Sequence, residues 1–194
     1  MFKLQLPTDP RWANIAKDNL KEILTDHAFC EQKAASSAIS IIVQFPEYTE
    51  ITEAMSALAI EEMEHFRMVH QKITDRGWSL GMERKDDYVN QLAVFFKKGC
   101  NRKQHLINKL LFGAMIEARS CERFRVLSEN IEDEELSNFY KELMISEANH
   151  YTLFLKFARK YGEGVCDVDK LWNDFLKYEA EVIADYGRKE MIHG

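Results

Sequence analysis

Two short stretches, IEEMEHF (60–66) and SEANHYT (146–152), each place a histidine three residues after a glutamate. In a helix this spacing brings the glutamate and the histidine onto the same face. The other positions on that face are apolar, so both pairs fall on the side that a soluble helix buries. The pairs are Glu62 with His65 and Glu147 with His150.

Each pair follows a lone glutamate that lies on the apolar or small-residue face of the preceding long helix. Glu31 precedes Glu62 by 31 residues, and Glu117 precedes Glu147 by 30 residues. The chain therefore carries two copies of one pattern: a helix with a buried-face glutamate, a short connection, and an antiparallel helix with Glu-x-x-His.

The 194 residues include only three prolines and eight glycines, which favours long helices joined by short loops. No segment alternates between apolar and polar residues for long enough to predict a strand. We expect an all-α fold, a four-helix bundle with additional short N-terminal, connecting and C-terminal helices, formed by a single domain over residues 1–194. The expected helices cover about 9–19, 18–45, 47–75, 86–98, 101–128, 132–161 and 167–187.

Four glutamates inside a bundle core need a compensating charge, because each buried and unpaired ion costs several kcal/mol. Two divalent cations would neutralise four carboxylates and would also bind the two imidazoles. Bundles that hold two iron or two manganese ions use this ligand set, one Glu from each of two helices and Glu-x-x-His from each of two others. The repeated pattern therefore predicts a two-metal site.

Other polar residues allow more than one interpretation. His27 lies one turn before Glu31 and either orients that glutamate or is a hydrogen-bonded histidine near the bundle end. The small residues Ala34, Ala35, Ala38, Gly113 and Ala114 either leave room for a substrate or allow tight helix packing. A third Glu-x-x-His, EMIH (190–193), has no partner helix, so we expect it at the surface or in the tail.

A basic segment stands out in a chain whose net charge is −6. Between Tyr88 and Ile116 the sequence has no aspartate or glutamate. Such a local positive field would suit phosphate groups, although a solvated basic face is the simpler explanation. The candidate contacts to nucleic acid are Lys97, Lys98, Arg102, Lys103 and Lys109.

The composition excludes several other classes of protein. No apolar run reaches the roughly 18 residues of a membrane span, so we expect no membrane association. The four cysteines form no CxxC pair, which argues against a zinc or rubredoxin-like centre and favours reduced thiols in the cytoplasm.

The sequence resembles the tRNA-(2-methylthio-N6-isopentenyladenosine) hydroxylases, a family of the ferritin-like superfamily. The matching stretches follow one another in the family's order and extend over most of the chain. Ferritin-like di-iron proteins share the metal motifs, whereas the residues around Glu31 and Glu117 point to this family. The stretches are DPRW (9–12), DHAFCEQKAA (26–35), EEMEHF (61–66), IEARSCERF (116–124) and SEANHY (146–151).

This resemblance implies a non-haem di-iron monooxygenase that hydroxylates the isopentenyl group of a modified adenosine next to the tRNA anticodon. It implies two iron ions as the cofactor and dioxygen as the co-substrate, with no catalytic residue beyond the metal ligands. The partners would be modified tRNA and, because the sequence has no flavin or iron–sulfur motif, an external reductase or ferredoxin. The ligands implied are the six that the spacing selects: Glu31, Glu62, His65, Glu117, Glu147 and His150.

Two other functions remain open on the sequence alone. A ferritin-like iron oxidase, storage protein or peroxide scavenger would use the same ligands without an organic substrate. A binding or structural bundle would hold no redox metal at all. Storage predicts iron mineral, whereas hydroxylation predicts turnover of modified tRNA.

Overall fold

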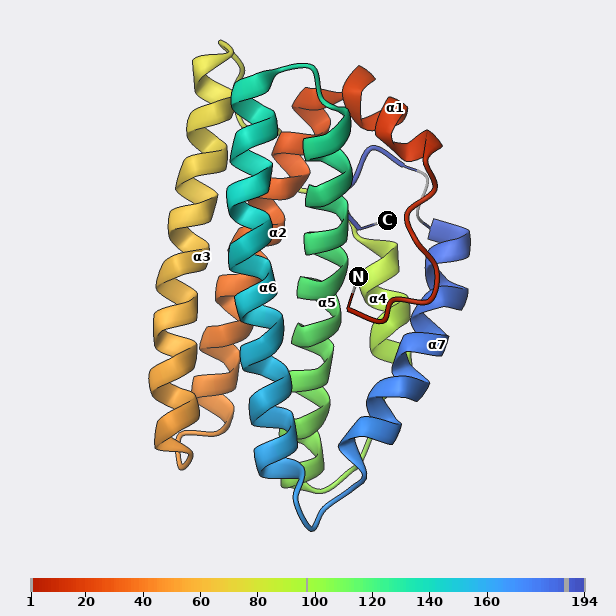
Figure 1. Cartoon of the computed structure of the whole chain (residues 1–194). Coiled ribbons are helices and arrows are strands. Elements are labelled where there is room, and N and C mark those ends of the chain that lie inside the picture. The colour runs from red at the N-terminus through yellow and green to blue at the C-terminus, as the bar shows by residue number, and fades with distance from the viewer. Residues whose placement is uncertain (1, 97, 187–188, 194) are drawn as a thin grey trace. The chain divides into compact units, whose positions relative to one another are not determined.

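The computed structural model describes residues 2–96, 98–186 and 189–193, and within these residues it contains helices and no strand (Figure 1). The chain divides into two compact units. One comprises Asp18–Lys85 and Glu190–Ile192, and the other the described parts of Met1–Lys17, Asp86–Lys189 and His193–Gly194. The helices are α1 (Arg11–Asp18), α2 (Leu20–Gln44), α3 (Thr49–Asp75), α4 (Asp87–Val94), α5 (Arg102–Asn130), α6 (Glu134–Gly162) and α7 (Val168–Tyr186).

The smaller unit is built on the hairpin of α2 and α3, which lie side by side along their lengths (Figure 1). The helix α2 stops just before Pro46, which has no N–H group to continue the helical hydrogen bonds. At the other end of the hairpin, α3 stops before Gly77, whose positive φ of 72° suits a residue without a side chain. Both ends agree with the sequence prediction within two residues.

In the larger unit, α5 and α6 form the second long hairpin. Asn101 caps α5 by accepting a hydrogen bond from the Gln104 amide, and Asp133 caps α6 in the same way at Leu136. Gly113 lies against the ring of Phe154, where an added Cβ atom would approach ring carbons to 2.8 Å. This small residue therefore serves tight helix packing rather than a cavity.

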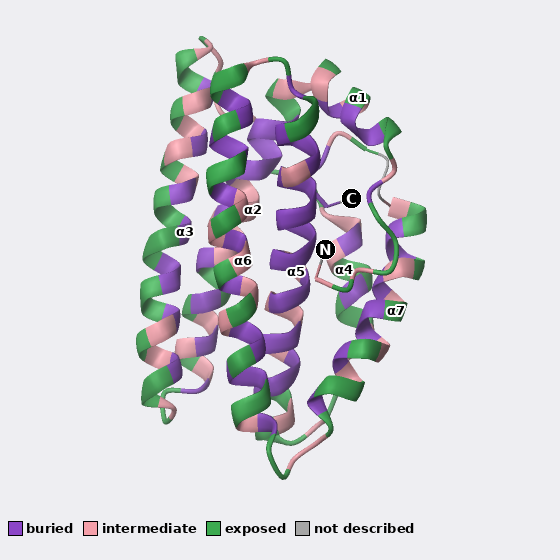
Figure 2. Ribbon diagram, viewed as in Figure 1, coloured by how far each residue is buried: buried purple, intermediate pink, exposed green. Residues whose placement is uncertain are grey.

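The helix α5 is buried on nearly every side, as Figure 2 shows. The N-terminal segment, α4 and α7 belong to the same unit and cover polar as well as apolar residues of α5. The helix α4 ends at Val94, earlier than the predicted position 98. The reason is tertiary, because the rings of Phe95 and Phe96 pack on Phe175 of α7, each with a centroid distance of 4.8 Å.

A buried ion network joins α5 to α7 and to the N-terminal segment. The Arg119 guanidinium donates to Glu179 Oε1 at 2.6 and 2.9 Å, to Glu122 Oε2 at 3.2 Å and to the Leu6 carbonyl at 3.0 Å. Tyr88 donates its hydroxyl to the same Glu179 oxygen at 3.0 Å. Burial lowers the pKa of Arg119, but the charge of Glu179 and its neighbours outweighs burial and raises it. The network therefore keeps Arg119 charged.

The expectation that EMIH (190–193) lies at the surface is wrong for its histidine. His193 is 2% exposed, and its Nε2 atom lies 2.9 Å from Ser120 Oγ on α5. Its ring stacks on Tyr88 at 5.9 Å, and its Nδ1 atom lies 3.5 Å from Asp86. The sequence offered no sign of this burial, because only long-range contacts cover so short a segment.

Across the described part of the chain, no helix combines the length and the apolar character that a membrane crossing requires. None of the four cysteines takes part in a disulfide bond.

Candidate metal centre

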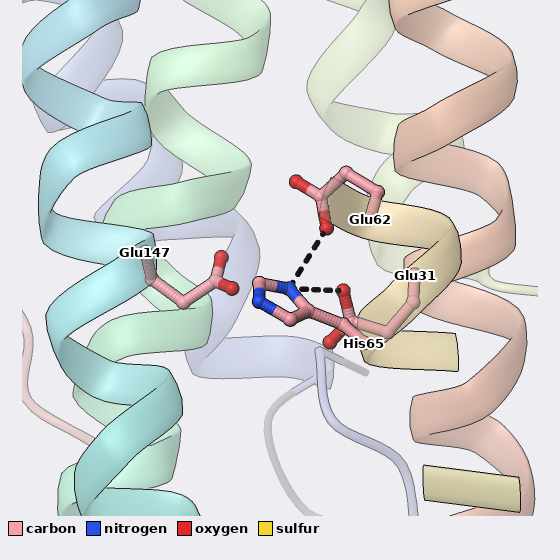
Figure 3. Close-up of side chains that lie close together, drawn as sticks. All are labelled: Glu31, Glu62, His65 and Glu147. Atoms are coloured by element: carbon pink, nitrogen blue, oxygen red, sulfur yellow. Dashed lines mark ion pairs between the residues drawn. The ribbon is translucent and has the colours of Figure 1, made fainter. Parts of the chain in front are cut away.

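The α2–α3 hairpin brings three of the predicted ligands together. Glu31 of α2 and Glu62 and His65 of α3 each offer a ligand atom, and these atoms all lie within 4.8 Å of one another. His65 Nδ1 is 3.4 Å from Glu62 Oε2 and 3.7 Å from Glu31 Oε2. Figure 3 shows dashed lines from one ring nitrogen of His65 to the carboxylates of Glu62 and Glu31, and it also labels Glu147 of α6. We call Glu31, Glu62 and His65 the first half-site.

His27 holds the lone glutamate of the first half-site in place. Its Nε2 atom lies 2.6 Å from Glu31 Oε1, and the His27 side chain is fully buried. Burial alone would raise the pKa of Glu31, but the hydrogen bond from His27 and the neighbouring His65 outweigh it and lower that pKa. Glu31 is therefore a carboxylate, the form that binds a cation. Of the two interpretations of His27, the structure supports the orienting one.

The α5–α6 hairpin carries the equivalent residues, which we call the second half-site: Glu117, Glu147 and His150. A carboxylate oxygen of Glu117 on α5 and a ring nitrogen of His150 on α6 lie within 4.8 Å of each other. Glu147 is one helical turn before His150 and shares its face. Both helices thus present their candidate ligands as the sequence spacing predicts.

Cys121 lies one turn beyond Glu117 and has a different role. Its thiol donates to the Met144 carbonyl at 3.2 Å. Burial, followed by the charge of Glu147, raises the pKa of Cys121 to about 12. The thiol therefore stays protonated and packs beside the second half-site rather than offering a thiolate to a metal.

The chemistry of these side chains fits hard or borderline divalent cations. All six are buried, with at most 6% of any one exposed. Two ligand atoms bound at right angles to one ion, each at about 2.1 Å, lie about 3 Å apart. The separations of 3.4 and 3.7 Å around His65 approach that value. Carboxylate and imidazole ligands without thiolate suit iron or manganese rather than copper(I).

The basic residues predicted from the sequence lie in the larger unit. Lys98, Arg102 and Lys103 are exposed at the turn before α5 and in its first turn, and Lys109 is half-buried. Lys97 lies outside the described residues. Burial, followed by the charge of Lys109, lowers the pKa of His105.

Comparison with known proteins identifies relatives over nearly the whole chain. The model of the family described as "tRNA-(MS[2]IO[6]A)-hydroxylase (MiaE)" matches residues 2–194. A Pseudomonas putida (strain KT2440) protein, "tRNA 2-(methylsulfanyl)-N(6)-isopentenyladenosine(37) hydroxylase", is 38% identical over 160 residues, which are 82% of this chain and 77% of the relative. A Salmonella typhimurium (strain LT2) protein of the same name is 28% identical and covers 98% of this chain and 87% of its own.

A solved structure shares the fold. "Protein 43 with aldehyde deformylating oxygenase activity from Synechococcus" superposes with a TM-score of 0.87 and 29% sequence identity, covering 98% of this chain and 95% of its own. The predicted all-α, ferritin-like fold is therefore confirmed. Together with the family match and the relative at 38% identity, it leads to one conclusion: this chain belongs to the tRNA-(MS[2]IO[6]A)-hydroxylase family, an enzyme family that its sequence already predicted.

Proposed function

We propose that this protein is a non-haem di-iron monooxygenase that hydroxylates the isopentenyl group of a 2-methylthio-N6-isopentenyl-modified adenosine next to the tRNA anticodon. The observation that carries the proposal is the family match over residues 2–194 of a chain with two buried half-sites. The relatives are named for a substrate with a methylsulfanyl group, an isopentenyl group and adenosine at position 37.

We propose that the two half-sites act as one centre for two iron ions. Four carboxylates would balance the charge of two divalent ions, and the two imidazoles would complete their ligand set. This arrangement would make residues 1–194 a single functional domain that comprises both compact units. The proposed ligands are Glu31, Glu62, His65, Glu117, Glu147 and His150.

The bound iron pair would supply the activation of dioxygen that an unactivated C–H bond requires. One oxygen atom enters the C–H bond, and the other leaves as water with two electrons and two protons. The protein holds the carboxylates ionised, as the His27 contact to Glu31 does, and its apolar residues exclude water. The electrons come from an external reductase or ferredoxin, and the reaction takes place in the cytoplasm, where modified tRNA is found.

The proposed activity can be tested with protein loaded with Fe(II) under anaerobic conditions. Modified tRNA, dioxygen and a chemical reductant are then added, and the nucleosides are analysed by mass spectrometry. We expect one added oxygen atom on the isopentenyl adenosine. Unchanged tRNA together with accumulation of iron mineral would favour the iron-storage function instead.

A second candidate function comes from the solved structure, which is named for an aldehyde deformylating oxygenase activity. The same iron-loaded protein should therefore be offered an aliphatic aldehyde with dioxygen and reductant. Release of formate at a rate above that of tRNA hydroxylation would make deformylation the better assignment. We expect no release of formate above the background of protein-free controls.

Replacing His27 with glutamine tests the orienting contact to Glu31. Partners that orient metal ligands typically contribute about 10–100-fold to metal affinity. We expect the His27→Gln variant to bind Fe(II) weaker by a factor in that range, measured by competition with a chelator. His70→Gln on α3 is the control and should bind iron as the unmodified protein does. Equal affinity in the two variants would show that His27 only fills space.

A further inference from the structure

A cavity of about 660 Å³ lies outside the candidate metal centre, in the larger unit. It is formed where α4 ends, α5 begins and α7 begins. Its volume falls in the range of about 300–1,000 Å³ that small-molecule sites occupy. The lining residues that matter here are Phe95, Phe96, Gln104, Asn108, Lys170 and Asp174.

One wall of the cavity is aromatic. Phe95 and Phe96 both line it, and both are only partly buried. Phe175 of α7 supports the two rings, stacked on Phe95 and edge-on to Phe96. Tyr178 lies against Phe95 at 5.4 Å. The Phe95 and Phe96 rings stand at 87° to each other, so a flat ligand can stack on one of them and meets the edge of the other.

Another wall presents amide groups. The Gln104 side chain donates to Asn108 Oδ1 at 2.8 Å, and Asn108 donates to Cys100 Sγ at 3.7 Å. These bonds fix both side chains, yet an amide has two donor hydrogens and an acceptor oxygen. Gln104 therefore keeps capacity to hydrogen-bond the edge of a ligand. Amide groups of this kind pair with the edges of nucleobases.

The lining itself carries Lys170 and two carboxylates, and further basic residues flank the lining residues Cys100 and Gln104 in the sequence. Exposed Lys98, Arg102 and Lys103 come from the segment that contains no acidic residue. Two carboxylates do line the cavity, but both have partners in α7. Asp167 accepts the Lys170 amide at 2.9 Å as the helix cap, and Asp174 lies 3.5 Å from the Lys177 ammonium.

We propose that this cavity binds an unpaired nucleobase of the tRNA, with the base stacked on the Phe96 ring and its edge bonded to Gln104. The proposal rests on tRNA being the substrate. Recognition of single-stranded RNA by aromatic stacking and edge hydrogen bonds is general, and the exposed cations of the 98–103 segment would hold the adjoining phosphates.

The base bound in the cavity is not the one that reacts. Asn108 precedes Glu117 by nine residues on α5, which is about 14 Å along the axis. Nine steps of about 100° also place the two residues on opposite sides of the helix. The cavity therefore takes a second base of the same tRNA, and it contributes binding rather than chemistry.

Binding of an RNA hairpin with the sequence of a tRNA anticodon arm tests the cavity directly. The Phe96→Leu variant keeps an apolar side chain but loses the flat ring, and we expect it to bind the hairpin about tenfold more weakly. Phe96→Tyr keeps the ring and should bind normally. Thermal unfolding of each variant shows whether the fold is retained.

A series of hairpins, each lacking one base, identifies the partner. We expect one abasic hairpin to bind the unmodified protein about tenfold more weakly than the intact hairpin does. The Phe96→Leu variant should bind this abasic hairpin and the intact hairpin with the same affinity. If Phe96→Leu binds every hairpin as the unmodified protein does, the cavity does not hold a base and the proposal is wrong.

The salt dependence of binding separates stacking from charge. Lys103→Ala should lower the slope of log affinity against log salt by about 0.7, the value for one phosphate contact on a single strand. Phe96→Leu should leave that slope unchanged, as should the control Lys156→Ala on the exposed face of α6. A reduced slope in Phe96→Leu would contradict stacking.

The same variants keep this proposal distinct from the proposed reaction. If the protein hydroxylates tRNA, Phe96→Leu should raise KM about tenfold and leave kcat unchanged. An unchanged KM would overturn the cavity proposal while hydroxylation stands. If the protein binds the hairpin through Phe96 but modifies no tRNA, the cavity proposal is supported and the proposed hydroxylation is wrong.

Discussion

The Glu117→Ala variant is expected to lose the paired-metal centre and at least 100-fold in hydroxylation rate. Glu117 is 4% exposed and comes within 4.8 Å of His150 through their ligand atoms. Removing a metal ligand should reduce metal affinity and activity by more than the roughly 10–100-fold that follows from removing a residue that only orients a ligand. Iron content per chain and the rate of nucleoside oxidation measure the two effects.

A matched control lies on the same helix. Glu122 is also buried, at 3% exposed, but it accepts hydrogen bonds from Thr8 and Arg119 instead of joining a half-site. The Glu122→Gln variant should keep its full iron content, whatever it loses in stability. If both variants retain iron equally, Glu117 is not a ligand.

The Arg119→Met variant is expected to unfold at a much lower urea concentration than the unmodified protein. Removing one partner of a buried ion pair costs about 3–5 kcal/mol, because the other charge is left uncompensated. In this protein Glu179 is fully buried and accepts two hydrogen bonds from Arg119. Urea unfolding of the metal-free protein should show a loss of this size in the free energy of unfolding.

Two further variants test the cause of that loss. Arg159 pairs with Asp169 at the surface, so Arg159→Met should change the unfolding free energy by no more than about 1 kcal/mol. Adding Glu179→Leu to Arg119→Met removes the stranded carboxylate and should recover part of the stability. If the double variant is less stable than Arg119→Met alone, the uncompensated charge is not the cause.

The sequence predicted the long helices because the residues that begin and end a helix act through local backbone geometry. Pro46 follows the end of α2 and Gly77 follows the end of α3, each helix ending within two residues of the expected position, and α5 begins one residue after the expected start at Asn101. The shared face of each Glu-x-x-His pair could be predicted for the same reason. A spacing of three residues on one helix fixes a shared face, whatever the rest of the chain does.

The features that the sequence did not predict depend on distant contacts. Arg119 and Glu122 look like solvent-facing residues of α5 until α7 and the N-terminal segment cover them. His193 looks like part of an exposed tail until its bond to Ser120 is seen. The short extent of α4 follows from ring packing on Phe175, which no local pattern encodes.

The pairing of the two half-sites is the central claim, and anomalous X-ray diffraction from iron-loaded crystals tests it most directly. We predict two iron peaks per chain, each in contact with residues of both the α2–α3 and the α5–α6 hairpins. A single peak, no peak, or ions held by one hairpin alone would contradict the claim.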